Sequence, residues 1–150
     1  MPFKEKFTWI SLVVFVVVPG VYLAQVLGQI GTTPVDEITY QLPMLAAVGV
    51  SIALTIAGTI VMGIGTGIAI EITGEGSVDD IGRDDERDKD IEVRGEVVGS
   101  YVMAVGMLGG LALAMLSYDQ FWIANVLFLG FVASSVVSAI VKLVAYRRGF

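Results

Sequence analysis

Four long apolar stretches, separated by polar connections, run through this chain of 150 residues. The apolar stretches cover about 7–29, 44–70, 97–116 and 121–144. Each is close to the length of about twenty residues that an α-helix needs to cross a hydrocarbon core of roughly 30 Å. The pattern predicts an all-α fold, in which residues 1–150 form a single integral-membrane domain and a four-helix transmembrane bundle.

The first apolar stretch has a competing interpretation as a signal peptide, because Lys4 and Lys6 precede it. Its apolar region is too long for that role, and no A-x-A-like cleavage site follows it. We therefore expect a retained first span. Pro19 and Gly20 lie near its middle and predict a kink, which membrane helices tolerate.

A dense run of charges of both signs at 84–96 leads without a break into the third apolar stretch. Asp85 and Lys89 form an acid-before-base pair at four-residue spacing, which supports a helix. Acidic residues in a first helical turn also complement the helix dipole. We predict an acidic loop and charged helix over 71–96, with the helix continuing into the third span.

The nine basic residues predict an orientation. They all lie before the first span, within 71–96, or toward the end of the fourth span. Short cytoplasmic segments carry an excess of Lys and Arg. Both termini and the 71–96 segment are therefore expected to be cytoplasmic, in a multi-pass protein of the plasma membrane.

Charge and composition narrow the chemistry. Residues 71–97 hold eleven acidic and four basic residues, so the net charge of −6 belongs to this segment. An acidic segment is a poor ligand for nucleic acid and for anionic lipid, so its expected partners are cations or a basic or regulatory protein. The chain has no Cys and no His, which removes thiol chemistry and the commonest metal ligand. We expect no catalytic residue, no cofactor, no metal site and no enzymatic activity.

Small residues recur at four-residue intervals in the spans, a spacing that lets helix backbones approach closely in lipid. These candidates for helix packing or for lining a path are Ser51, Thr55, Thr59, Gly63, Gly67, Gly106, Gly110, Ser134 and Ser138. Packing within the chain is the expected role, and a stripe left facing outward would serve a homo-oligomer. Asn125 in the fourth span is expected to form an interhelical hydrogen bond rather than to line a path.

The charged helix supplies the candidates for partner binding. Arg87, Ile91 and Arg94 fall on one face, at spacings of four and three, and Asp85 lies just before them. That face can dock on the ends of the other spans or on a partner. The plainer interpretation is a solvated extension that anchors the third span.

Three motifs carry a resemblance to a known family. They are D-E-R-D-K-D-I at 85–91, F-W-I-A-N-V at 121–126 and V-K-L-V-A-Y-R-R-G-F at 141–150. Together they resemble a family of small uncharacterised prokaryotic four-span integral-membrane proteins, over nearly the whole chain. The resemblance implies a bacterial or archaeal plasma membrane and a four-span layout. It implies no established activity. Members of the family resemble products often encoded near small DNA-binding regulators, which is a weak pointer to signalling.

Two functions follow as hypotheses. The first is a non-enzymatic membrane protein whose acidic loop and helix bind a protein partner, as a sensor, tether or accessory subunit. The second is a homo-oligomeric channel or small-solute facilitator, lined by the stripe from Ser51 through Thr55 to Thr59 and by Asn125. The spans hold almost no ionisable groups, apart from Lys142 near one end, which argues against a proton-coupled carrier.

Overall fold

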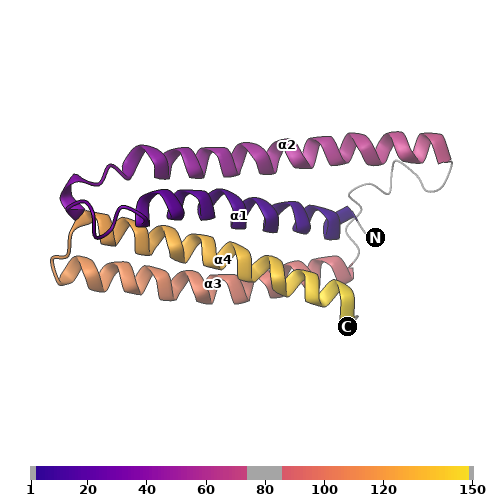
Figure 1. Cartoon of the computed structure of the whole chain (residues 1–150). Coiled ribbons are helices and arrows are strands. Elements are labelled where there is room, and N and C mark those ends of the chain that lie inside the picture. The colour runs from indigo at the N-terminus through magenta and orange to yellow at the C-terminus, as the bar shows by residue number, and fades with distance from the viewer. Residues whose placement is uncertain (1–2, 74–85, 149–150) are drawn as a thin grey trace.

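The computed structural model describes residues 3–73 and 86–148, and in these ranges the long elements are all α-helices (Figure 1). In chain order they are α1 (Phe3–Leu27), the short 3-10 helix η1 (Val35–Glu37), α2 (Gln41–Thr73), α3 (Glu86–Met115) and α4 (Gln120–Arg148). All four α-helices are long and apolar enough to cross a membrane. The prediction of an all-α, multi-pass membrane protein with four candidate spans is confirmed.

The helices follow one another in space in the order α2, α1, α4, α3 (Figure 1). α1 begins, and α4 ends, at the same end of the molecule, which we call the terminal end; α2 ends and α3 begins there too. The charged run and the third span form one continuous helix from Glu86 onward, as the sequence predicted. The preceding acidic loop, Asp85 included, lies outside the described residues.

α3 and α4 are in direct backbone contact. A Cβ atom built on Gly106 would lie 2.5 Å from the Cα of Gly130, so only glycine fits where these helices cross. Nearer the terminal end, the hydroxyl of Ser134 donates a hydrogen bond of 2.7 Å to the carbonyl oxygen of Gly99. Gly110 meets the side chain of Leu127 in the same way. Small residues thus bring the two helices together, as is common for helix pairs in lipid.

Larger side chains join α1 to α4. Tyr22 packs edge-to-face on Phe128 with 4.9 Å between ring centroids, and Phe15 packs on Phe131 at 5.9 Å. At the terminal end, the guanidinium of Arg147 lies 5.5 Å from the ring centroid of Trp9, a cation–π contact. These contacts hold α1 on the side of α4 away from the glycine contact.

The end opposite the terminal end is closed by an apolar and aromatic cluster. Its buried members are Tyr22, Val26, Ile38, Tyr40, Ala47, Phe121 and Phe128. Tyr40 packs edge-to-face on Phe121 with 5.3 Å between the rings, so the segment that enters α2 is tied to the start of α4. The cluster therefore joins α1, α2 and α4 at this end.

The α3–α4 turn is a helix stop of recognised geometry. The amide of Tyr118 bonds the carbonyl of Leu113, and the amide of Ser117 bonds that of Ala114, which is the Schellman pattern. Ser117 has a φ of +58°, the left-handed conformation that usually falls to glycine at this position. The tight reversal sets α3 and α4 antiparallel and side by side.

We predict that Gly106→Ala destabilises the protein, because the new methyl group collides with backbone that cannot rotate away. Overpacking of this kind costs about 1–3 kcal/mol. Gly63→Ala is the matched control, since a Cβ at Gly63 meets nothing within 4 Å. Ala at that position should be neutral or stabilising by up to about 1 kcal/mol. Unfolding in mixed micelles measures both, and equal effects would contradict the close α3–α4 contact.

Candidate functional site

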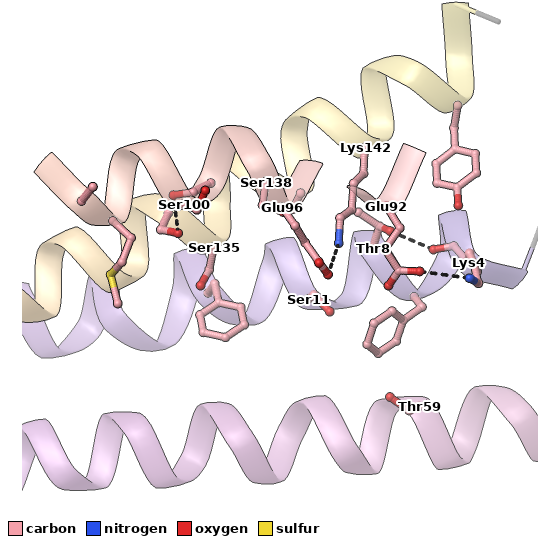
Figure 2. A pocket seen from close by; sticks show the side chains of 18 of the residues that line it. Lys4, Thr8, Ser11, Thr59, Glu92, Glu96, Ser100, Ser135, Ser138 and Lys142 are labelled. Carbon is pink, nitrogen blue, oxygen red and sulfur yellow. Dashed lines mark hydrogen bonds and ion pairs between the residues drawn. The ribbon is translucent and has the colours of Figure 1, made fainter. Parts of the chain in front are cut away.

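A cavity of about 810 Å³ occupies the half of the molecule nearer the terminal end (Figure 2). Its walls are α1 and α3, and α4 lies between them as the floor; Thr59 is the described residue of α2 that borders it. The cavity exists because α1 and α3 each pack on α4 and stand apart from one another. We call this space, with its walls and floor, the groove.

Two ion pairs lie at the terminal end of the groove (Figure 2). The Lys4 ammonium on α1 lies 3.1 Å from a Glu92 carboxylate oxygen on α3. The Lys142 ammonium on α4 lies 3.7 Å from Glu96, one turn further along α3. All four side chains are partly exposed, so each pair contributes at most about 1 kcal/mol of stability. The four charges nevertheless lie together at the rim of the groove.

Close packing against Gly95 on α3 holds Lys142 in this position. A Cβ atom on Gly95 would collide with the aliphatic stem of Lys142, so the absence of a side chain there lets the stem lie against α3. The stem covers apolar surface while the ammonium reaches the rim, which is how lysine behaves near the ends of membrane helices. The glycine on α3 thus positions a charged group of the site.

Hydroxyl groups line the groove below the ion pairs. Several of them already donate to their own helix: Thr8 to the carbonyl of Lys4, Ser100 to that of Val97, and Ser135 to that of Phe131. A hydroxyl that donates its proton to the backbone can still accept hydrogen bonds, but it cannot donate one to a bound molecule. This part of the groove is therefore mildly polar and carries no charge.

The second-span stripe is not assembled into one site. Thr55 and Thr59 donate to carbonyl oxygens one turn back in α2, at 2.8 and 2.7 Å. Ser51 is buried, and its hydroxyl has no hydrogen-bond partner among the described residues. A Cβ atom on Gly63 or Gly67 would meet nothing within 4 Å. Of this stripe, Thr59 alone borders the groove.

The other small residues predicted from the sequence lie at α3 and α4. Gly106 and Gly110 are at the close contact between these helices, and Ser134 and Ser138 lie both there and on the groove floor.

Asn125 is buried, with 2% of its surface exposed, and it joins α4 to α1. The Tyr22 hydroxyl donates to the Asn125 side-chain oxygen at 2.8 Å. The Asn125 amide nitrogen donates to the Phe121 carbonyl at 2.8 Å. The expected interhelical hydrogen bond is present, and Asn125 is outside the groove.

The predicted partner-binding face on α3 is exposed in part. Arg87 and Arg94 are exposed, but Ile91 between them has only 3% of its surface exposed. Ile91 packs inside the protein because the turn that carries it already lies against the other helices. Docking on neighbouring spans, the alternative drawn from the sequence, therefore applies to Ile91.

The four charged residues of the rim were missed as a site. Lys4 and Lys142 were assigned to orientation, and Glu92 and Glu96 to the acidic segment. Two signals could have drawn attention to them. Glu92 and Glu96 are one turn apart on a single face, and Lys142 lies more deeply in its span than the other bases. Neither signal states that the lysines and glutamates meet.

Fold and site together define a multi-pass membrane protein with four candidate spans and an internal groove that has a charged rim. Comparisons with protein-family models, with curated proteins and with solved structures found no match. The resemblance noted above therefore rests on its sequence motifs. Within the described residues, no group of three or more acidic side chains is arranged to hold a metal ion.

We predict that Tyr22→Phe lowers the free energy of unfolding by about 1 kcal/mol, because it leaves a buried amide oxygen without its donor. Tyr101→Phe is the control, since Tyr101 is 70% exposed on α3. Thermal unfolding in detergent micelles compares the two variants. Equal midpoints would show that the Tyr22–Asn125 bond does not stabilise the contact between α1 and α4.

Proposed function

We propose that this protein is a non-enzymatic membrane protein that binds one amphipathic molecule of the bilayer in the groove. The observation that carries the proposal is the groove itself, about 810 Å³ in volume, with ion pairs at one end and Phe15, Met103 and Met107 along its walls. Binding sites for small molecules are typically 300–1,000 Å³, mostly apolar, and carry a few polar groups that orient the bound molecule.

Membrane physics supports this choice of occupant. Polar side chains in a membrane span are costly unless they face a partner or a filled cavity. Here hydroxyls from four helices face one space, and charges lie only at its end. A molecule with one polar and one apolar end satisfies both regions. Methionine and phenylalanine walls suit a flexible chain, since methionine adapts its shape to irregular contacts.

Binding of a protein partner at the start of α3 is the second proposal. It is supported by the exposure of Arg87 and Arg94, and by Val93, which is 59% exposed among charged neighbours. An apolar side chain framed by charges is typical of a surface that forms an interface. On this proposal the protein acts as a sensor, tether or accessory subunit. The proposal includes the membrane orientation that places this segment in the cytoplasm.

The channel hypothesis has less support. Its proposed lining includes Asn125, whose hydrogen bonds are made inside the protein, and Thr55, whose proton is used within α2. A path built on these groups needs further copies of the chain to complete it. Homo-oligomerisation itself stays a prediction.

For the groove, we predict that the wild-type protein, extracted in mild detergent, retains one amphipathic molecule by native mass spectrometry. Ala104→Trp should weaken this retention, because Ala104 lines the groove and an indole would occupy space that the bound molecule needs. Ala112→Trp is the control, at an exposed position of α3 outside the groove. Both variants should elute as the wild type does on gel filtration. Equal retention by the two tryptophan variants would contradict the proposal.

For the partner, we predict that a polypeptide co-purifying with the wild type is lost on Arg87→Glu with Arg94→Glu. Reversal of two exposed charges introduces like-charge repulsion at such an interface. Replacement of Lys6, which is exposed on α1, by Glu supplies a control for general charge effects. A wild type that never co-purifies with a defined polypeptide contradicts this second proposal and leaves the first unaffected.

A further inference from the structure

The three helices that form the walls and floor of the groove share a broad order of polarity. Along α1, from the terminal end inward, the lining residues are Lys4, Phe7, Thr8, Ser11 and Phe15. Along α3 they are Glu92, Glu96, Gly99, Ser100, Met103, Ala104 and Met107. Along α4, which runs the other way, they are Tyr146, Lys142, Ala139, Ser138, Ser135 and Ser134. On each helix a charged group precedes the serine and threonine hydroxyls, and on α1 and α3 apolar side chains follow those hydroxyls.

This sequence of chemical character is that of a glycerophospholipid. Such a lipid has a charged headgroup, then ester groups that accept hydrogen bonds, then a hydrocarbon chain. Three helices that share one order give the groove a polar end and an apolar end (Figure 2). A uniformly apolar peptide helix would not match that order, because it has neither a charged end nor a polar section to face the hydroxyl groups.

The depth of the groove corresponds to one leaflet. Glu92 and Met107 are fifteen residues apart on α3, which is roughly 22 Å at 1.5 Å per residue. Half of a bilayer of about 40–45 Å, headgroup regions included, is about 20–22 Å. A lipid whose headgroup lies at the ion pairs would thus have its chain tip near Met107, at the middle of the bilayer.

The rim distinguishes one headgroup class from another. It presents two ammonium groups and two carboxylates, paired as Lys4 with Glu92 and Lys142 with Glu96. A phosphate can accept from the lysines while an ammonium group of the same lipid donates to the glutamates. A purely anionic headgroup would face two uncompensated carboxylates. Asp88, which lies near Tyr146 at the same end, adds to that repulsion.

The kind of ammonium group follows from the same residues. A primary ammonium group donates hydrogen bonds, which carboxylates accept, whereas a quaternary one is usually held in a cage of aromatic rings. Tyr146 and Phe7 are the aromatic residues of the groove near the rim, and two rings do not make such a cage. The carboxylates of Glu92 and Glu96 favour the primary ammonium group.

We propose that the groove binds one glycerophospholipid with a zwitterionic, primary-ammonium headgroup, of the phosphatidylethanolamine type, taken from the leaflet at the terminal end. The proposal rests on the proposed function of the groove and specifies its occupant. The lysines hold the phosphate, Glu92 and Glu96 hold the ammonium group, and one acyl chain follows Ser100, Met103 and Met107 along α3.

The test uses the full-length protein in vesicles that contain a trace of phosphatidylethanolamine with a photoreactive acyl chain. Mass spectrometry then locates the cross-links. We expect cross-links at Met103, which lines the groove and is only partly exposed, and at Leu108 and Leu111, which are exposed outside it. Unlabelled phosphatidylethanolamine should reduce the groove cross-links about fivefold more effectively than phosphatidylglycerol, for a preference of about 1 kcal/mol. The exposed positions should respond equally to both lipids.

A charge variant gives a second measurement. Glu92→Gln with Glu96→Gln leaves a net positive rim, so phosphatidylglycerol should become the better competitor at Met103. Glu86→Gln with Asp90→Asn changes the same number of charges at exposed positions outside the groove, and should keep the wild-type preference. Persistence of that preference in the Glu92 and Glu96 variant would overturn the assignment of the headgroup.

The remaining outcomes separate this inference from the function on which it rests. Groove cross-links that both lipids reduce equally would overturn the headgroup assignment and leave a groove that binds lipid. Cross-links at Leu108 and Leu111 without any at Met103 would overturn both, because the groove would then hold no lipid chain.

Discussion

The backbone contact between α3 and α4 is the constraint on which the rest of the structure depends. Where Gly106 meets Gly130, neither helix has a side chain to hold its partner away. Lipid tails are as apolar as the side chains they surround, so burial of apolar area gives helices in a bilayer little reason to associate. Close packing and the Ser134–Gly99 hydrogen bond must supply the attraction instead. The short turn through Ser117 keeps the two helices in register.

The groove is a geometric result of two unlike helix contacts on α4. On one side, glycines bring α3 into backbone contact; on the other, the rings of Phe15 and Tyr22 hold α1 in place. Because α1 and α3 both use α4 and diverge from it, a space opens between them toward the terminal end. At the opposite end the aromatic cluster packs between α1, α2 and α4 instead. The two ends of the molecule are therefore built differently, with the groove toward the terminal end.

The sequence predicted mainly the parts of this structure that depend on single helices. Apolar runs marked four spans, and the charged run before the third span proved to be one helix with it from Glu86 onward. These predictions succeed because length and hydropathy are properties of one segment at a time. Asn125 was also expected to bond across helices, and does so with Tyr22, although its sequence did not indicate the partner.

The groove could not be predicted in the same way, because it depends on which faces meet. The Ser51–Gly67 stripe and the Gly106–Gly110 pair look alike as spacings, yet Gly106 and Gly110 meet α4 closely while Gly63 and Gly67 meet nothing within 4 Å. Likewise, the sequence around a lysine near a helix end is the same whether the lysine only sets the orientation or also forms an ion pair. Ile91 is a related case: its local sequence is compatible with docking on the other spans or on a partner, and its burial favours the other spans.

The attachment of α2 has a consequence for what stability means in this protein. α2 is held by the aromatic cluster and by the contact of Gly58 with Ile10, while Gly63 and Gly67 beyond them have open space around them. A helix in lipid keeps its internal hydrogen bonds when it leaves a neighbour, since lipid offers no others. Departure of α2 is therefore a lateral dissociation of an intact rod, and the α3–α4 pair can survive it. The protein therefore has two separable equilibria: the association of α2 with the other helices, and the pairing of α3 with α4. Changes in bilayer thickness can shift the association of α2 without disrupting the α3–α4 pair.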